Sequence, residues 1–164
     1  MELPQSVQPL FATAGWQKVR RVPVNPMVPV RHPAYEILAQ IGGLHVGRCG
    51  PGVECATSDL KFEYCEADVE IVDTWGHLLG STIFGVAEVH HNHGWLFVDE
   101  VGRCFGASQI HDAFYFEGVT FGEAVENILL GCKSRPMLRP DQEQIDLYGE
   151  TFARGNPAIL DFRS

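Results

Sequence analysis

The amino-acid sequence predicts an α+β fold in which helices flank a central, mostly antiparallel sheet. Two observations predict the sheet: Ile83–Val89 and Trp95–Val98 are apolar runs of β-favouring residues, and short turn-like connections join them to each other and to Arg103–Phe105. A third observation predicts the helices, because apolar residues recur at helical spacing before and after these runs. Sequential strands with helices on either side are typical of the α+β class.

The strand that begins at Trp95 is expected at the centre of the sheet. Trp95 and Phe97 alternate with Leu96 and Val98, so both faces of this strand are apolar. A strand that is apolar on both faces belongs in the middle of a sheet with other elements packed on each side. We therefore expect an antiparallel meander over residues 83–106.

Proline and glycine delimit the helices expected near the N-terminus. Residues 5–14 predict a short helix that ends at Gly15, and residues 22–31, with three prolines, predict extended chain. Pro33 begins a clearer helix, which the glycine pair after Ile41 ends. The expected core face of this helix consists of Ala34, Ile37, Leu38 and Ile41.

The next segment combines strands and a helix. Residues 44–46 predict a short strand, residues 47–57 a loop, residues 60–65 an amphipathic strand, and residues 66–79 a helix that ends at Gly80. In the amphipathic strand, the side chains expected to face the core are Leu60, Phe62 and Tyr64, and those expected to face away are Lys61, Glu63 and Cys65. The expected apolar stripe of the helix is Val69, Val72, Trp75 and Leu79.

The chain after the meander has one strong helix signal. Thr120 followed by Glu123 is a capping-box pattern, and Gly131 ends the helix that it begins. Residues 107–119 are expected to be irregular, residues 140–148 to form a further helix, and residues 157–162 a terminal extended piece. The expected core face of the capped helix is Phe121, Ala124, Val125, Ile128 and Leu129.

The composition is that of an ordinary globular protein. Hydrophobic residues make up 45% of the 164 residues and charged residues 20%, so we expect one domain over residues 1–164. No apolar run approaches the roughly 20 residues that span a bilayer, and no signal peptide is evident, so we expect neither a membrane partner nor export. The five cysteines contain no C-x-x-C pair, which favours reduced thiols in a cytoplasm.

Acidic residues are concentrated in one segment. Seven carboxylates oppose Lys61 alone over residues 54–73, and the formal net charge of the chain is −9. Such a surface repels phosphates, which argues against direct nucleic-acid binding, and it suits a basic protein partner. A solvated face that keeps the protein soluble is the alternative interpretation. The candidate partner-binding residues are Glu63, Glu66, Asp68, Glu70 and Asp73.

The turn that contains His90, His91 and His93 has the densest group of potential metal ligands. Imidazoles are good zinc ligands, but the spacing is not that of a helical H-E-x-x-H motif, and a polar hairpin connection explains the cluster without a metal. The sequence also lacks G-x-S-x-G, a P-loop and any cysteine with a local activating signal. We therefore predict no catalytic residue, no metal site and no cofactor. A small metal-binding protein that uses these three histidines is the alternative hypothesis.

Several short motifs follow one another along the chain. They are Ala14-Gly15-Trp16, Arg20-Arg21, His32-Pro33-Ala34, Ile41-Gly42-Gly43-Leu44, Leu79-Gly80, Trp95–Arg103, Gly118–Ala124 and Leu129-Leu130-Gly131. Their order resembles that of the SUKH superfamily, in particular its third subgroup, over roughly residues 10–132. Residues 133–164 form a C-terminal extension outside the resemblance, and so does the turn at His90–His93.

The resemblance implies an immunity protein of a bacterial polymorphic toxin system, made in the cytoplasm. Such a protein binds and neutralises a cognate toxin, often a nuclease or a nucleic-acid deaminase, by direct protein–protein contact without catalysis. An acidic inhibitor fits the basic cleft of such a toxin. Eukaryotic members resemble interaction proteins, so a regulatory scaffold is the alternative function. The matching positions expected to be structural are Trp16, Gly42, Gly43 and Gly102.

Overall fold

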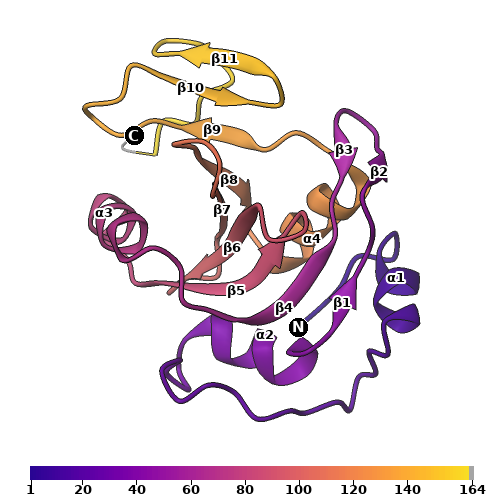
Figure 1. The fold of residues 1–164 in the computed structure, drawn as a ribbon. Coiled ribbons are helices and arrows are strands. Elements are labelled where there is room, and N and C mark those ends of the chain that lie inside the picture. The colour runs from indigo at the N-terminus through magenta and orange to yellow at the C-terminus, as the bar shows by residue number, and fades with distance from the viewer. Residues whose placement is uncertain (163–164) are drawn as a thin grey trace.

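The computed structural model describes residues 1–162 and confirms the predicted α+β class (Figure 1). Within these residues, seven strands form one antiparallel sheet, and two short hairpins lie outside it. In spatial order the strands of the sheet are β1 (His45–Val46), β4 (Leu60–Cys65), β5 (Ile83–Val89), β6 (Gly94–Asp99), β7 (Cys104–Ser108), β8 (Phe114–Gly118) and β9 (Arg135–Met137). The hairpins pair β2 (Gly50–Pro51) with β3 (Ala56–Thr57), and β10 (Gln144–Leu147) with β11 (Glu150–Ala153).

Strand β6 lies at the centre of the sheet, as its two apolar faces predict. It is the fourth of the seven strands and pairs with β5 on one side and β7 on the other. Leu96 and Val98 belong to the core cluster on one face of the sheet, and Phe97 belongs to the cluster on the other face, with Trp95 packed against it. The predicted meander over residues 83–106 is therefore confirmed.

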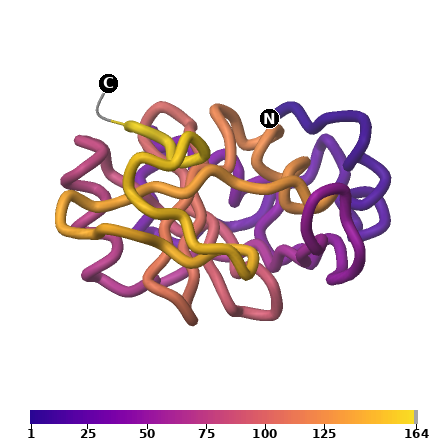
Figure 2. Tube along the Cα trace, turned by 90° about the horizontal axis from the view of Figure 1, so that it is seen from above, coloured from indigo at the N-terminus to yellow at the C-terminus, as the bar shows by residue number. Residues whose placement is uncertain are grey.

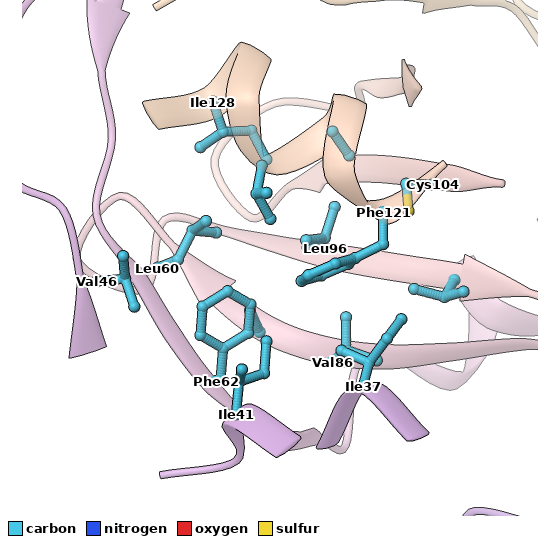
Figure 3. Close-up of a cluster of buried hydrophobic side chains, with 14 of the residues drawn as sticks. Ile37, Ile41, Val46, Leu60, Phe62, Val86, Leu96, Cys104, Phe121 and Ile128 are labelled. Carbon is cyan, nitrogen blue, oxygen red and sulfur yellow. The ribbon is translucent and has the colours of Figure 1, made fainter. Parts of the chain in front are cut away.

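Three helices cover one face of the sheet, which we call the closed face. They are α1 (Gln8–Thr13), α2 (Pro33–Ile41) and α4 (Phe121–Leu130). Figure 3 shows side chains from α2, α4, β4 and β6 converging on one another. Phe62 is fully buried between the rings of Phe11 and Phe121, whose centroids lie 5.8 and 5.9 Å from its own. Burial of each such ring stabilises the fold by about 1.5 to 3 kcal/mol.

Local sequence explains where the helices of the closed face begin and end. His32 Nδ1 accepts a hydrogen bond from Ala34 N at 3.1 Å, and Pro33 occupies the first helical position of α2. In α4, Thr120 Oγ1 accepts a hydrogen bond from Glu123 N at 3.2 Å. Gly131 ends α4 with a φ of +73°, in the left-handed region that favours glycine.

Helix α3 (Val69–Leu79) packs on the opposite face of the sheet, which we call the open face. Trp75 of α3 stacks on Phe114 of β8, with ring centroids 4.1 Å apart and an interplanar angle of 10°. The predicted apolar stripe of this helix is only partly correct, because Val69 is 71% exposed at its first turn. The apolar residues of α3 that pack against this core are Ile71, Val72, Trp75, Leu78 and Leu79.

The amphipathic strand departs from its predicted alternation at one residue. Leu60 and Phe62 are fully buried and Lys61 is exposed, as expected. Cys65, however, is buried rather than facing away. The register between β4 and β5 shifts between Phe62 and Cys65, so the simple two-residue period fails there.

The second half of the chain contains strands that the sequence did not predict. Residues 107–119 are not irregular throughout, because β8 pairs with both β7 and β9, and Phe114 is 2% exposed. Residues 140–148 do not form a helix, because Gln144–Leu147 is strand β10, and Tyr148 and Gly149 after it have φ values of +57° and +73°. Two consecutive left-handed residues make a tight hairpin turn, which joins β10 to β11.

The C-terminal end of the described chain runs back along the sheet. Residues 157–162 form turns and coil rather than a strand, and Leu160 N donates a hydrogen bond to Pro136 O at 2.8 Å. Figure 2 shows this C-terminal segment and the N-terminal segment at different ends of the molecule. None of the helices in residues 1–162 is long and apolar enough to cross a membrane.

Candidate functional site

A groove of about 450 Å³ lies on the open face, beside α3. We call it the α3 groove. Its base is formed by the stacked rings of Trp75 and Phe114. The groove is lined by residues of α3 and its cap, of the connection between β7 and β8, and of the segment after β9. The other residues that line it are Asp68, Glu70, Ile71, Thr74, Ala107, Ser108, His111, Asp112, Ala113, Arg139 and Asp141.

The charge of the α3 groove is predominantly negative. Four carboxylates and one guanidinium line it. Two of the carboxylates, Asp68 and Glu70, come from the first turn of α3 and its cap. Asp68 Oδ1 accepts a hydrogen bond from Glu70 N at 2.9 Å, so Asp68 caps the helix as well as lining the groove.

The opposite side of the groove is held by an arginine. Arg139 donates two hydrogen bonds of 2.6 Å to the two carboxylate oxygens of Asp112, and its Nε lies 3.5 Å from Asp141 Oδ1. The paired guanidinium holds the pKa of Asp112 below its usual range, so this carboxylate stays ionised. Because one arginine is shared by two carboxylates, the groove keeps its net negative charge.

The structure separates the five acidic residues that the sequence grouped together. Asp68 and Glu70 line the α3 groove. Asp73 lies on another side of α3, where it lines a shallow hollow together with Glu100. Glu63 lies on β4 and forms an ion pair of 2.6 Å with Lys61. Glu66 is exposed in the connection between β4 and α3.

Sequence reasoning did not identify Asp112, Arg139 or Asp141 as members of a site. Asp112 lies in the connection before β8, and the other two follow β9. They meet α3 only because β8 pairs with both β7 and β9, and β8 was not predicted. The residues around Asp112 and Phe114 show no alternation that would have predicted this pairing.

The histidine turn is placed next to a buried carboxylate. Asp59 is 5% exposed, and its Oδ2 lies 2.6 Å from His45 Nε2. Its Oδ1 accepts hydrogen bonds from Cys49 Sγ at 3.3 Å and from His91 N at 3.1 Å. His90 Nδ1 lies 3.3 Å from the same sulfur. We call these residues the Asp59 cluster: His45, Cys49, Asp59, His90 and His91.

The three histidines proposed as a metal-binding set do not come together as a triplet. His90 and His91 belong to the Asp59 cluster, whereas His93 lies outside it and lines a hollow together with His90, His111 and Tyr115. His90 and His91 have φ values of +54°, so the backbone of the turn directs their side chains in a way that the sequence spacing does not indicate.

The electrostatics of the Asp59 cluster do not activate its thiol as a nucleophile. Burial raises the pKa of Cys49, and the neighbouring carboxylate of Asp59 contributes in the same direction through its charge. Burial alone also raises the pKa of Asp59, but hydrogen bonds from His45, Cys49 and His91 outweigh it and lower that pKa overall. A neutral thiol beside an ionised carboxylate is a poor nucleophile.

A second buried carboxylate lies at the edge of the closed face. Glu117 is 5% exposed, and its Oε2 accepts a hydrogen bond from Ser134 Oγ at 2.8 Å. Tyr148 OH in turn accepts one from Ser134 N at 2.8 Å. Burial raises the pKa of Glu117 to about 7. This network connects β8 to the turn between β10 and β11.

Comparison with known proteins gives the family. The SUKH-3 immunity protein family matches residues 3–131, which is most of the chain. No curated protein and no solved structure matches it. The chain therefore belongs to the SUKH-3 immunity protein family, which confirms the resemblance seen in the sequence motifs. An immunity role follows, and with it a toxin protein as the general kind of partner.

Proposed function

We propose that this SUKH-3 immunity protein neutralises its toxin by direct, non-catalytic binding through the α3 groove. The observation that carries the proposal is the charge of the groove, where four carboxylates and one guanidinium surround an aromatic base. A toxin that acts on nucleic acid, such as a nuclease or a deaminase, has a basic surface for its substrate. The groove complements such a surface in charge.

The arrangement of the groove supports a binding role. Glu70 of α3 and Asp141 of the segment after β9 both line the groove, so a basic projection of the toxin that enters it meets carboxylates from two different segments of the chain. Trp75 and Phe114 are each 2% exposed, which leaves their rings as a rigid base rather than a mobile surface. A rigid concave site loses little conformational entropy on binding.

One side of the groove lies outside the part of the chain that matches the family. Glu70 and the rest of α3 fall within residues 3–131, whereas Arg139 and Asp141 follow them. We infer that the segment after residue 131 adjusts the groove to one particular toxin. Specificity of this kind comes from charges placed at the margin of an interface.

The proposal is tested by two charge-reversal variants of equal total charge. The first, Glu70→Lys with Asp141→Lys, alters both sides of the groove and retains the helix cap at Asp68. The matched control, Glu66→Lys with Asp73→Lys, alters exposed residues of the same acidic segment that do not line the groove. The readouts are rescue of cells that express the toxin encoded beside the gene, and the association rate with that toxin.

We expect the groove variant to lose rescue and to associate about tenfold or more slowly at low salt, because steering by charge is lost. The difference in association rate between the groove variant and the wild-type protein should become smaller as salt is added. The control variant should rescue and should associate at close to the wild-type rate. Equal behaviour of the two variants would show that the groove is not the binding site.

A further inference from the structure

We propose that Cys49, Asp59 and His91, none of which lines the α3 groove, bind a zinc ion at one end of the sheet. One ligand atom from each of these residues lies within 4.8 Å of the other two. The set differs from the histidine triplet suggested by the sequence, because it uses one histidine, one thiol and one carboxylate. Thiolate sulfur, imidazole nitrogen and carboxylate oxygen are the ligand atoms that zinc takes in proteins.

Strand register explains why these three residues meet. Leu60 of β4 pairs with Val46 of β1 on one side and with Val89 of β5 on the other. The residue before Leu60 is Asp59, so it lies between the chain that leaves β1 and the chain that leaves β5. Cys49 is in the first of these connections and His91 is in the second.

Two of the three distances between the ligand atoms match those between neighbouring ligands of one tetrahedral ion, and all three are within 4.8 Å. Asp59 Oδ1 lies 3.3 Å from Cys49 Sγ and 3.5 Å from His91 Nδ1. Zinc bonds of about 2.0 Å to oxygen or nitrogen and about 2.3 Å to sulfur, at tetrahedral angles, place such ligand atoms roughly 3.3 to 3.5 Å apart. The ion therefore fits with little movement of Asp59, which is already held in position.

Other contacts orient the three ligands in the way that metal sites require. His45 Nε2 lies 2.6 Å from Asp59 Oδ2, which leaves Oδ1 directed at Cys49 and His91. His90 Nδ1 lies 3.3 Å from Cys49 Sγ, so with its proton on Nδ1 this imidazole donates a hydrogen bond to the sulfur. Hydrogen bonds to ligating carboxylates and sulfurs are the usual second layer of a zinc site.

Binding exchanges one proton for the ion. The Cys49 thiol now donates its hydrogen to Asp59 Oδ1. When zinc binds, this proton leaves to solvent, the sulfur binds as thiolate, and the ion takes the place of the hydrogen between sulfur and oxygen. The side chain of His91 is 65% exposed, so the fourth position of a tetrahedral ion is open to water.

Metal titration tests the proposal in the full-length protein without any toxin. Protein treated with chelator and a thiol reductant is titrated with Co²⁺, which reports thiolate ligation by a charge-transfer band and tetrahedral geometry by intense visible bands. Zn²⁺ is then added as competitor, and bound zinc is measured by elemental analysis. We expect both sets of bands, their loss on addition of zinc, and one zinc bound per chain.

Matched variants assign the ligands. Cys49→Ser should abolish the charge-transfer band, whereas Cys132→Ser, which alters another half-buried thiol, should retain it. His91→Ala should weaken Co²⁺ binding by at least about tenfold, and His93→Ala should not. His91 is exposed, so its variant folds even if the Cys49 variant does not, and circular dichroism verifies this. Absence of the band from the wild-type protein, or its persistence in Cys49→Ser, would overturn the proposal.

Discussion

The two faces of the sheet have the same kind of core but differ in how completely they are covered. On the closed face, α1, α2 and α4 surround Phe62, which is fully buried among other rings. On the open face, Trp75 of α3 stacks on Phe114 of β8, and both residues line a groove beside the helix. The closed face therefore serves stability, whereas the open face combines stability with a surface that a partner can enter.

The largest expected effect is on stability, and it is measured by removing one aromatic ring from each face. Phe62→Ala should cost about 4 kcal/mol of the free energy of unfolding, because the cavity is enclosed on all sides. Trp75→Ala should cost nearer 3 kcal/mol although it removes a larger ring, because its cavity opens into the groove and can relax. Urea unfolding of both variants measures the difference. An equal or larger loss for Trp75→Ala would mean that the two faces are equally closed.

The second prediction concerns the buried carboxyl of the closed face. Burial raises the pKa of Glu117 from its ordinary value of 4.5 to about 7, so the folded protein binds this proton more tightly than the unfolded chain does. The contribution of Glu117 to stability is complete below pH 4.5 and is lost as the pH rises through about 7. At pH values well above 7 the loss is on the order of 3 kcal/mol.

Glu117→Gln keeps the shape and removes this titration. The free energy of unfolding of both proteins is measured across the same pH range. We expect that of the variant to increase relative to that of the wild-type protein as the pH rises. Glu123→Gln is a suitable control, because that carboxylate lies at the exposed end of α4. If the difference between Glu117→Gln and wild type does not change with pH, then Glu117 is not titrating in this range.

The smallest expected effect on stability concerns the ion pair at the edge of the groove. Arg139→Ala breaks the pair with Asp112, whose side chain is 68% exposed, so no buried charge is left without a partner. The cost should stay below about 1 kcal/mol. Association with a basic toxin should be unchanged or faster at low salt, because the groove becomes more negative. Slower association of this variant would instead make Arg139 a direct contact.

Local patterns were sufficient for most of the closed face. The central strand was identified because Trp95–Val98 is apolar on both sides, and α2 and α4 were identified by proline, capping and glycine signals at their ends. These patterns act over a few residues, and the tertiary structure agrees with them. The predicted alternation of the amphipathic strand was wrong only at Cys65, where a shift of register with β5 changes the direction of the side chain.

The segment after Gly106 shows where local patterns are insufficient. Phe114–Gly118 has no alternation that distinguishes it from irregular chain, yet hydrogen bonds to β7 and β9 make it a strand. Residues 140–148 were predicted to be a helix, but Gln144–Leu147 forms a strand that pairs with β11 through the left-handed turn at Tyr148 and Gly149. Pairing between strands is non-local, so the residues themselves do not reveal it.

The sequence by itself determined the fold class, the central strand, the helices of the closed face and the family. Each depends on residues that are close together in the chain or on motifs in a fixed order. Only the tertiary structure decided which charges meet. It brought Glu70 and Asp141 to the lining of one groove, and Cys49 and His91 to Asp59. The physical reason is that strand pairing and register, not sequence distance, bring these side chains together.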